Sequence, residues 1–296
     1  MKELFLELES ICPVVRDADM RNYTSFSIGG PADVLAEPEN EKQLARVLAL
    51  LKNAPHAVIG NGSNLLVGDG GFRGVLVRLS SAFSNVRVEG NRIYASAGAT
   101  LAHVAKVALE AGLSGMAPLA GIPGTVGGAM VMNAGAYGGE MADVIESSTC
   151  ITKDGRRETL SDHDFSYRHS VYAENGAVVT GAVFALREGD KEKIREEMRT
   201  LSIKRREKQP LTLPSAGSAF KRPEGGFAAQ MIDEAGLRGF SVGGAAVSEK
   251  HAGFVVNTGG ATARDVRTLL SLVQEKVQKT HGVLLTPEIR FLGEFI

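Results

Sequence analysis

Residues 121–139 read GIPGTVGGAMVMNAGAYGG, with seven glycines in nineteen positions and no charged side chain. The whole chain has 35 glycines in 296 residues, well above the usual share of roughly 7%. No collagen-like period explains this excess, so it indicates loops and close approaches of the backbone. A stretch this poor in side chains is hard to keep folded by itself. We therefore expect residues 121–139 to wrap around another group.

The overall composition is ordinary for a globular protein. A net charge of −1 without a long basic run does not indicate binding to nucleic acid or a membrane surface. No window approaches ~18 consecutive apolar residues, so no transmembrane helix is expected. The N-terminal MKELFLELESICPVV carries scattered acidic residues, which argues against a signal peptide. Cys12 and Cys150 form no CxxC motif, which indicates a reducing compartment, and a cytoplasmic location is expected.

Short strands and amphipathic helices alternate along the chain, which predicts an α+β protein of at least two units. Strands are predicted at 56–59, 75–79, 92–96, 178–179, 183–185, 242–247 and 253–257, with a hairpin turning at Asp154-Gly155. Helices are predicted at 44–51, 101–109, about 190–209, 227–234, and from a capping box at 262–265 to Gly282. The charged helix ending before Pro210 would connect two domains.

A second glycine-rich segment, Gly60-Asn61-Gly62-Ser63-Asn64, follows the predicted strand at 56–59. It is not a Rossmann fingerprint, because Leu65 takes the third glycine position and no clear βαβ unit follows. No P-loop occurs either, since the chain has no Gly-Lys-[Ser/Thr] sequence of that motif. The small side chains would let backbone N–H groups approach an anion such as a pyrophosphate. A pair of ordinary glycine turns remains the alternative.

Three polar side chains stand in unusual surroundings. Arg168, among aromatic residues, has the planar fork that pairs with a substrate carboxylate, or it is simply exposed. Ser218, in AGSAF, is either a proton donor that its neighbours aim or part of a turn, and AGSAF is not the Gly-x-Ser-x-Gly of a hydrolase. Glu288, in the apolar strand predicted at TPEIRF, needs a partner or a raised pKa; a salt bridge to Arg290 is the alternative. Nothing near His169 has metal-ligand spacing, and no metal is expected.

Taken together, these stretches resemble the UDP-N-acetylenolpyruvoylglucosamine reductase family. The motifs that carry the resemblance occur in the order of the family and span nearly the whole chain: Asn22-Tyr23-Thr24, Ile28–Asp33, IGNGSNLLV at 59–67, AGIPGTVGGAMVMNAGAYGGE at 120–140, Tyr167–Ser170, AGSAFK at 216–221 and PEIRF at 287–291. The resemblance implies an α+β fold in which an FAD-binding domain of the vanillyl-alcohol-oxidase (PCMH) type is joined to a C-terminal α+β substrate-binding domain. The glycine-rich stretch would then lie around FAD.

The resemblance also implies the domain limits and the reaction. The FAD-binding region would span 1–200, in two subdomains of about 1–70 and 71–200, followed by a substrate-binding domain at 201–286 and a returning C-terminal strand at 287–296. NADPH would reduce a non-covalent FAD, whose N5 would pass the hydride to C3 of the enolpyruvyl group, with protonation at C2. The product would be UDP-N-acetylmuramate, a peptidoglycan precursor. The enzyme is expected to be a monomer.

Individual roles follow from the same resemblance. Arg168 and Glu288 would stabilise an enolate, and Ser218 would protonate C2. The implied FAD-binding residues are Ile59, Gly60, Asn61, Gly62, Ser63, Asn64, Leu65, Ala120, Gly121, Pro123, Gly124, Thr125, Gly127, Gly128, Asn133, Ala134 and Gly135. The implied substrate-binding residues are Tyr167, Lys221, Arg222, Lys250 and His251. The basic run 204–206 would meet the diphosphate, or it is a solvated helix face.

This chain resembles the shorter members of the family. Only 49 residues separate Arg168 from Ser218, which leaves no room for the inserted loop whose tyrosine closes over the substrate in longer members. Arg222 stands where the longer members commonly have asparagine, so we expect an altered phosphate contact there. Two other functions stay open: a different flavin oxidase on the same fold, and a nucleotide-sugar binding protein without turnover.

Overall fold

The computed structural model describes residues 2–296, which divide by their internal contacts into two compact units. Unit 1 comprises the chain up to Val15, Leu35–Asn61 and Leu76–Arg205. Unit 2 comprises Arg16–Val34, Gly62–Val75 and Arg206–Ile296. Each unit is therefore assembled from separate stretches of sequence. The contiguous domain limits expected from the sequence stay a prediction.

The limits of the units fall inside secondary-structure elements. A four-stranded sheet has the order β1 (Val14–Asp19), β2 (Pro31–Ala36), β5 (Phe72–Arg78) and β3 (His56–Ile59). The first three of these strands, and the long helix α5 (Lys191–Lys208), each contribute residues to both units. Division of a strand between two units cannot be read from local sequence patterns.

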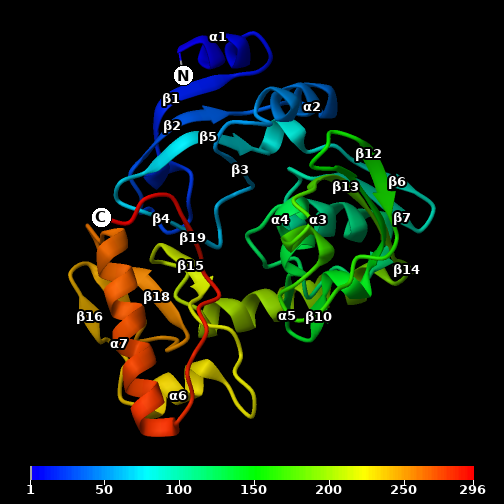
Figure 1. Cartoon of the computed structure of the whole chain (residues 1–296). Coiled ribbons are helices and arrows are strands. Elements are labelled where there is room, and N and C mark those ends of the chain that lie inside the picture. Colours follow the sequence, from blue (N-terminus) through cyan, green and yellow to red (C-terminus); the bar gives the residue numbers. More distant parts are fainter. Residues whose placement is uncertain (1) are drawn as a thin grey trace. The chain divides into compact units, whose positions relative to one another are not determined.

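Unit 1 contains an antiparallel sheet of five strands in the order β12 (Arg157–Leu160), β11 (Ile145–Ile151), β13 (Val178–Ala185), β7 (Arg92–Ser96) and β6 (Val86–Glu89). Figure 1 shows α3 (Leu101–Ala111) and α4 (Val126–Met132) beside this sheet, and α4 contacts β13. Thr100 caps the N-terminus of α3, and Gly112 ends it in the left-handed conformation. The sheet and α3 form the support for the glycine-rich stretch, of which α4 is a part.

The other elements of unit 1 are short. They comprise α1 (Lys2–Glu9), α2 (Glu41–Leu50), the pair β8 (Leu113–Ser114) and β14 (Arg187–Glu188), the hairpin β9 (Gly135–Ala136) and β10 (Gly139–Glu140), and the 3-10 turns η2 (Ser81–Phe83), η3 (Met141–Asp143) and η4 (Val171–Ala173). The hairpin turns at Tyr137 and Gly138, both with positive φ (53° and 86°), as a two-residue turn of this kind requires.

Unit 2 packs two helices on a four-stranded antiparallel sheet. The strand order is β15 (Ser215–Ser218), β18 (Phe254–Asn257), β17 (Ala245–Val247) and β16 (Ser241–Val242). The helices are α6 (Ala228–Glu234) and α7 (Ala263–His281). In the same unit, β4 (Leu65–Val67) pairs in parallel with β19 (Arg290–Leu292). The 3-10 turn η1 (Met20–Asn22) also belongs to this unit.

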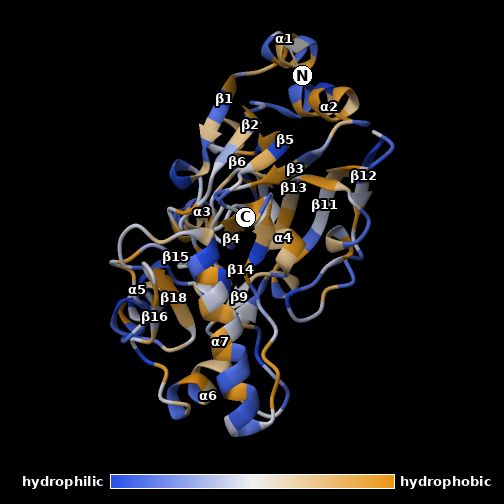
Figure 2. Cartoon of the chain, turned by 60° about the vertical axis from the view of Figure 1, so that its left-hand side comes forward, coloured by the Kyte–Doolittle hydropathy of each residue, from blue (hydrophilic) through white to orange (hydrophobic). Residues whose placement is uncertain are grey.

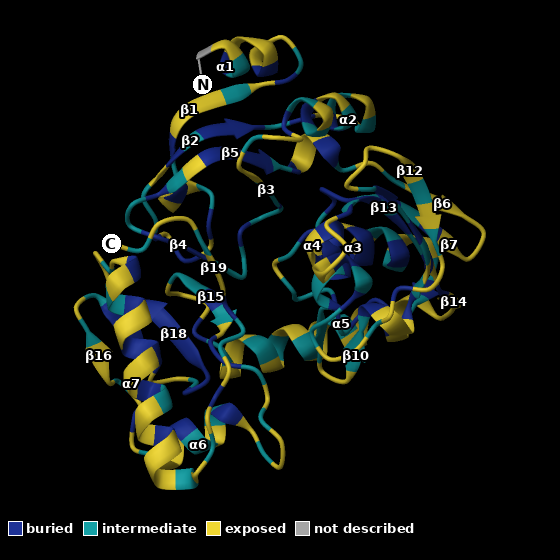
Figure 3. Cartoon of the chain, viewed as in Figure 1, coloured by how far each residue is buried: buried dark blue, intermediate teal, exposed yellow. Residues whose placement is uncertain are grey.

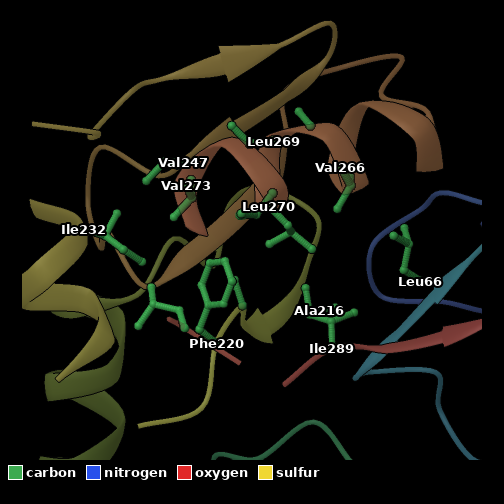
Figure 4. Close-up of a cluster of buried hydrophobic side chains, with 14 of the residues drawn as sticks. Leu66, Ala216, Phe220, Ile232, Val247, Val266, Leu269, Leu270, Val273 and Ile289 are labelled. Carbon is green, nitrogen blue, oxygen red and sulfur yellow. The ribbon is translucent and has the colours of Figure 1, made fainter. Parts of the chain in front are cut away.

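The hydrophobic core of unit 2 lies along one face of α7. Val266, Leu269, Leu270 and Val273 are buried with Phe220 and Ile289 (Figure 4). The helical spacing of these residues produces an apolar stripe, and the opposite face of α7 is hydrophilic and exposed (Figures 2 and 3). Phe220 and Ile289 in this core belong to the two segments that carry Ser218 and Glu288. The core thus anchors both segments.

Most predicted elements are confirmed, including the Asp154-Gly155 hairpin, the capping box of α7 and the glycine ends of α3 and α7. Two strand predictions are wrong, and two predicted strands are parts of one. Residues 178–185 form one strand, because Thr180 and Gly181 continue the extended backbone through a bulge. The strand predicted at 242–247 is a hairpin broken at Gly243-Gly244. The C-terminal strand begins only at Arg290, so Glu288 lies just before it.

No helix within residues 2–296 is long and apolar enough to cross a membrane.

Candidate active site

The two glycine-rich segments meet inside unit 1. A Cβ atom on Gly60 would lie 2.2 Å from the hydroxyl oxygen of Thr125. Beside it, the Asn61 side-chain amide donates a hydrogen bond of 3.3 Å to the carbonyl oxygen of Pro123. Residues that are more than sixty positions apart in the sequence therefore form one surface. Only glycine leaves room for this approach at position 60.

Two neighbouring glycines of α4 are in different environments. Gly127 is buried, its N–H donates to the carbonyl oxygen of Ala97, and a Cβ there would lie 3.1 Å from that of Ala97. Gly128 is exposed, and a Cβ there would meet only Thr125, at 3.6 Å. Packing within the protein explains the glycine at 127 and does not explain the glycine at 128.

Arg205 contributes a half-buried positive charge beside the same segment. Its guanidinium lies 3.1 Å from where a Cβ on Gly121 would be, and burial lowers its pKa from the ordinary value. Its flanking residues Lys204 and Arg206 are exposed, so the basic run is a solvated face at those two positions. Ile194, Met198 and Leu201 lie at helical spacing on the inward face of α5, and position 205 continues that spacing. This pattern in the sequence distinguishes Arg205 from Lys204 and Arg206.

Arg168 lies in a tight turn at which Ser166 and His169 exchange backbone hydrogen bonds. Its φ of +56° is in the left-handed region, which is costly for an arginine. The guanidinium donates a hydrogen bond of 2.9 Å to the carbonyl oxygen of Gly135. The Arg168 side chain is therefore held against the glycine-rich stretch of unit 1.

Asn133, an expected FAD-binding residue, is fully buried, with a side chain that makes contacts within the protein. Its amide donates to the carbonyl oxygen of Ser166 at 3.1 Å, and its side-chain oxygen accepts from the N–H of Ala142 at 3.0 Å. The side chain therefore ties the glycine-rich stretch to the Arg168 turn. Any contact between Asn133 and a cofactor stays a prediction.

Ser218 and Glu288 lie on paired segments in unit 2. The N–H of Glu288 donates to the carbonyl oxygen of Ala219 at 2.9 Å, and the N–H of Lys221 donates to that of Thr286 at 2.8 Å. Ser218 is exposed and follows Gly217, whose φ of +77° favours glycine. Glu288 is half-buried. The pairing fixes the backbones of both residues in one neighbourhood.

The segment after Asn61 also supports Glu288. The Asn64 side-chain amide donates to the carbonyl oxygen of Glu288 at 3.2 Å, and the N–H of Arg290 donates to that of Asn64 at 2.9 Å. A Cβ on Gly62 would lie 2.3 Å from the carbonyl oxygen of Tyr23, so the glycine at 62 serves close packing of two backbones. The predicted segment 59–65 is thus divided between the units, and in unit 2 it positions Glu288.

The expected substrate-binding residues of unit 2 differ in their contacts. The rings of His251 and Phe254 pack edge to face, and Phe254 is paired with Ser218. The pKa of His251 is lowered by burial and by the nearby charges of Arg238 and Lys208. The Lys250 ammonium donates to the carbonyl oxygen of Arg206 at 2.5 Å. Lys221 is half-buried next to Arg222, whose guanidinium lies 4.6 Å from the centre of the Phe227 ring. Tyr167, in unit 1, is exposed.

Among residues 2–296, no three His, Cys, Asp or Glu side chains are arranged to hold a metal ion.

Comparison with known proteins identifies the class of the protein. Residues 32–161 match the family description "FAD binding domain", and residues 209–292 match "UDP-N-acetylenolpyruvoylglucosamine reductase, C-terminal domain". The chain is an oxidoreductase that joins an FAD-binding domain to a distinct C-terminal domain, which confirms the predicted fold class and the FAD cofactor. It belongs to the UDP-N-acetylenolpyruvoylglucosamine reductase family.

The similarity extends over nearly the full chain. The UDP-N-acetylenolpyruvoylglucosamine reductase of Caldanaerobacter subterraneus is 50% identical over 279 residues, which cover 93% of this chain and 92% of that protein. The crystal structure of the reductase from Thermus caldophilus superposes with a TM-score of 0.83 at 38% identity, covering 95% of this chain and 98% of that one. A structure of alkyldihydroxyacetonephosphate synthase matches 64% of this chain and 41% of its own, with a TM-score of 0.51 and 18% identity, and shares the fold alone.

Proposed function

We propose that the protein catalyses the FAD-dependent, NADPH-driven reduction of UDP-N-acetylglucosamine enolpyruvate to UDP-N-acetylmuramate. The observation that carries this proposal is the fixed pairing of the Ser218 and Glu288 segments, because this reaction needs a proton donor and a group that stabilises an enolate. The names of full-length relatives support the substrate, and the FAD-binding domain supports the cofactor. The same proposal includes a monomeric state and a cytoplasmic location for the protein.

The glycine-rich surface of unit 1 fits FAD. Gly60 packs directly on Thr125 and so brings the two glycine-rich segments together, Gly128 is exposed without a packing reason for its glycine, and Arg205 places a half-buried cation beside Gly121. Backbone N–H groups and a cation suit a pyrophosphate. The residues that would hold FAD are Ile59 to Leu65, Ala120, Gly121, Pro123, Gly124, Thr125, Gly127, Gly128, Asn133, Ala134 and Gly135. When bound, FAD supplies the hydride for C3 of the enolpyruvyl group after reduction by NADPH.

Arg168 and Glu288 would bind the substrate carboxylate as negative charge develops there. The arginine would supply charge-assisted hydrogen bonds, which are stronger than neutral ones. Glu288 would act as a hydrogen-bond donor while protonated. The turn that fixes Arg168 and the pairing that fixes Glu288 would both reduce the reorganisation that the proposed catalysis requires.

Ser218 would deliver the proton to C2. Its hydroxyl is exposed, so it is accessible to a substrate, and its backbone is fixed between Gly217 and the core residue Phe220. Serine is a weak acid, so the hydroxyl would relay a proton from water or another residue. Tyr167, Lys221, Arg222, Lys250 and His251 would bind the rest of the substrate, with the basic residues meeting the diphosphate.

Anaerobic spectroscopy tests this function. NADPH should bleach the flavin absorbance of the purified protein, and addition of the enolpyruvyl substrate should restore it with formation of the lactyl ether. Bleaching without restoration would instead indicate another flavin enzyme of the same fold. A protein that gains no flavin absorbance when FAD is added would be a binding protein, and the proposal would be wrong.

A further inference from the structure

A buried network of polar side chains in unit 1 is centred on Ser148. The hydroxyl oxygen of Ser148, in β11, lies 2.7 Å from Nε2 of His163 and 2.6 Å from the phenolic oxygen of Tyr172. All three residues are buried, with exposed fractions of 1%, 4% and 4%. One serine hydroxyl thus connects an imidazole and a phenol away from solvent.

These two partners of Ser148 stand at the two ends of the loop that carries Arg168. His163 begins the loop, and Tyr172 ends it within η4. The ends are also joined directly, since the N–H of Val171 donates to the carbonyl oxygen of His163 at 2.8 Å. The His163 ring stacks on Phe165, with ring centres 4.9 Å apart. Ser148 therefore fastens both ends of the loop to one point of the sheet.

Contacts on the glycine-rich stretch hold the middle of the loop. Asn133 donates to the carbonyl oxygen of Ser166, Arg168 donates to that of Gly135, and the Ser170 hydroxyl donates to that of Val131 at 3.1 Å. The left-handed backbone at Arg168 persists only if its surroundings enforce it. The Ser148 network adds to these contacts at the two ends of the loop.

We propose that Ser148, His163 and Tyr172 are positioning residues that fix the loop 163–172, and through it the side chain of Arg168. This inference rests on the proposed function, because it assumes that Arg168 acts on the substrate. In a buried network each polar group depends on its partners, so removal of one hydroxyl loosens the whole set. A small displacement of a catalytic group costs rate without any loss of direct contact.

The test compares Tyr172→Phe in two backgrounds. Phenylalanine keeps the buried ring and removes only the hydroxyl, which meets Ser148 and the thiol of Cys150. In the otherwise native enzyme this change should slow oxidation of the reduced flavin by the enolpyruvyl substrate roughly 10- to 100-fold. It should leave reduction by NADPH unchanged. In an Arg168→Ala background, the same change should cause no further slowing. Equal slowing in both backgrounds, or of both half-reactions, would overturn the inference.

Two further variants separate positioning from folding. His163→Gln keeps a hydrogen-bonding group and should be milder than His163→Ala. Thr149→Val is the matched control: Thr149 adjoins Ser148 in β11, but its hydroxyl pairs with that of Thr180 at 2.9 Å. It should leave the substrate half-reaction unchanged. If Thr149→Val slows this half-reaction as much as Tyr172→Phe, the network has no special connection to Arg168.

Amide hydrogen exchange distinguishes failure of this inference from failure of the proposed function. Exchange at residues 164–170 should be faster in Tyr172→Phe than in the native protein, and unchanged in Thr149→Val. If Arg168→Ala alone leaves the substrate half-reaction intact, the proposed role of Arg168 is wrong, and faster exchange would still support the positioning of the loop. Unchanged exchange in Tyr172→Phe would refute the positioning itself.

Discussion

The main-chain N–H of Glu288 donates a hydrogen bond of 2.9 Å to the carbonyl oxygen of Ala219, the residue that follows Ser218. Seventy positions of sequence separate the serine from the glutamate, yet the segments that carry them are paired. Phe220, two residues after the serine, and Ile289, the residue after the glutamate, both lie in the same core. The side chains proposed for proton donation and for enolate stabilisation thus share one support.

Glu288→Gln should be less harmful than Glu288→Ala. If Glu288 acts while protonated, the neutral amide keeps a hydrogen-bond donor, whereas alanine removes it. Rates of the substrate half-reaction in the two variants check this. Equal loss in both variants would mean that the ionised carboxylate, or a purely structural role, is what matters.

Gly128→Ala should stabilise the apoprotein while it weakens FAD binding. Gly128 is exposed in α4, a Cβ there has room on the protein side, and alanine is favoured over glycine in a helix by about 1 kcal/mol. The methyl group would instead occupy space needed by the cofactor. Thermal melting of the apoprotein and titration with FAD measure the two effects. Unchanged FAD affinity would remove Gly128 from the cofactor site.

Gly127→Ala serves as the comparison for that experiment. A Cβ at 127 would press on Ala97 at 3.1 Å, so this variant should lose stability. A melting temperature higher than that of Gly128→Ala would contradict the packing described for the two glycines.

The flavin should be bound without a covalent link. Covalent attachment commonly uses histidine or cysteine, and neither occurs in 57–75 or 112–141. Acid precipitation should therefore release all of the yellow colour into the supernatant. Flavin fluorescence that stays with the polypeptide on a denaturing gel would disprove this.

Stability should fall as the pH is lowered from about 6.5. Burial lowers the pKa of His163 below its ordinary value of 6.5, and burial and nearby positive charges lower that of His251. Below pH 6.5 the unfolded chain takes up protons that the folded protein excludes, so stability is lost until the lower folded pKa values are passed. Urea unfolding between pH 7.5 and 5 measures this, and His163→Gln should make the dependence shallower. An unchanged slope in this variant would mean that His163 is not held neutral.

Local sequence patterns predicted the elements that rely on local signals. The capping box at Thr262 and Asp265, the glycine ends of α3 and α7, and the Asp154-Gly155 turn are specified within a few residues. Helix α4 was missed, because its glycines resemble a loop, and tertiary contacts with Ala97 and Ala99 hold it in place. The hairpin at 241–247 was predicted as one strand, because the valines and alanines on both sides of Gly243-Gly244 are typical of a continuous strand.

The site was predictable as a set of candidate residues rather than as an arrangement. Arg168, Ser218 and Glu288 were selected by residue type and by family resemblance, and their roles stay predictions. The support around them was not predictable. The contact of Gly60 with Thr125, the use of Asn133 to hold the Arg168 turn, and the Ser148 network all depend on residues brought together from distant parts of the sequence.

Stopped-flow measurement of the two half-reactions of Ser218→Ala tests the central claim most directly. The change removes one exposed hydroxyl, so folding and FAD binding should survive. Reduction by NADPH needs no proton at substrate C2 and should keep its native rate, while oxidation by the enolpyruvyl substrate should slow by roughly 10²- to 10⁴-fold. Ser218→Cys should recover part of that rate, because a thiol can also donate a proton. If Ser218→Ala slows both half-reactions equally, the serine positions the flavin and is not the proton donor.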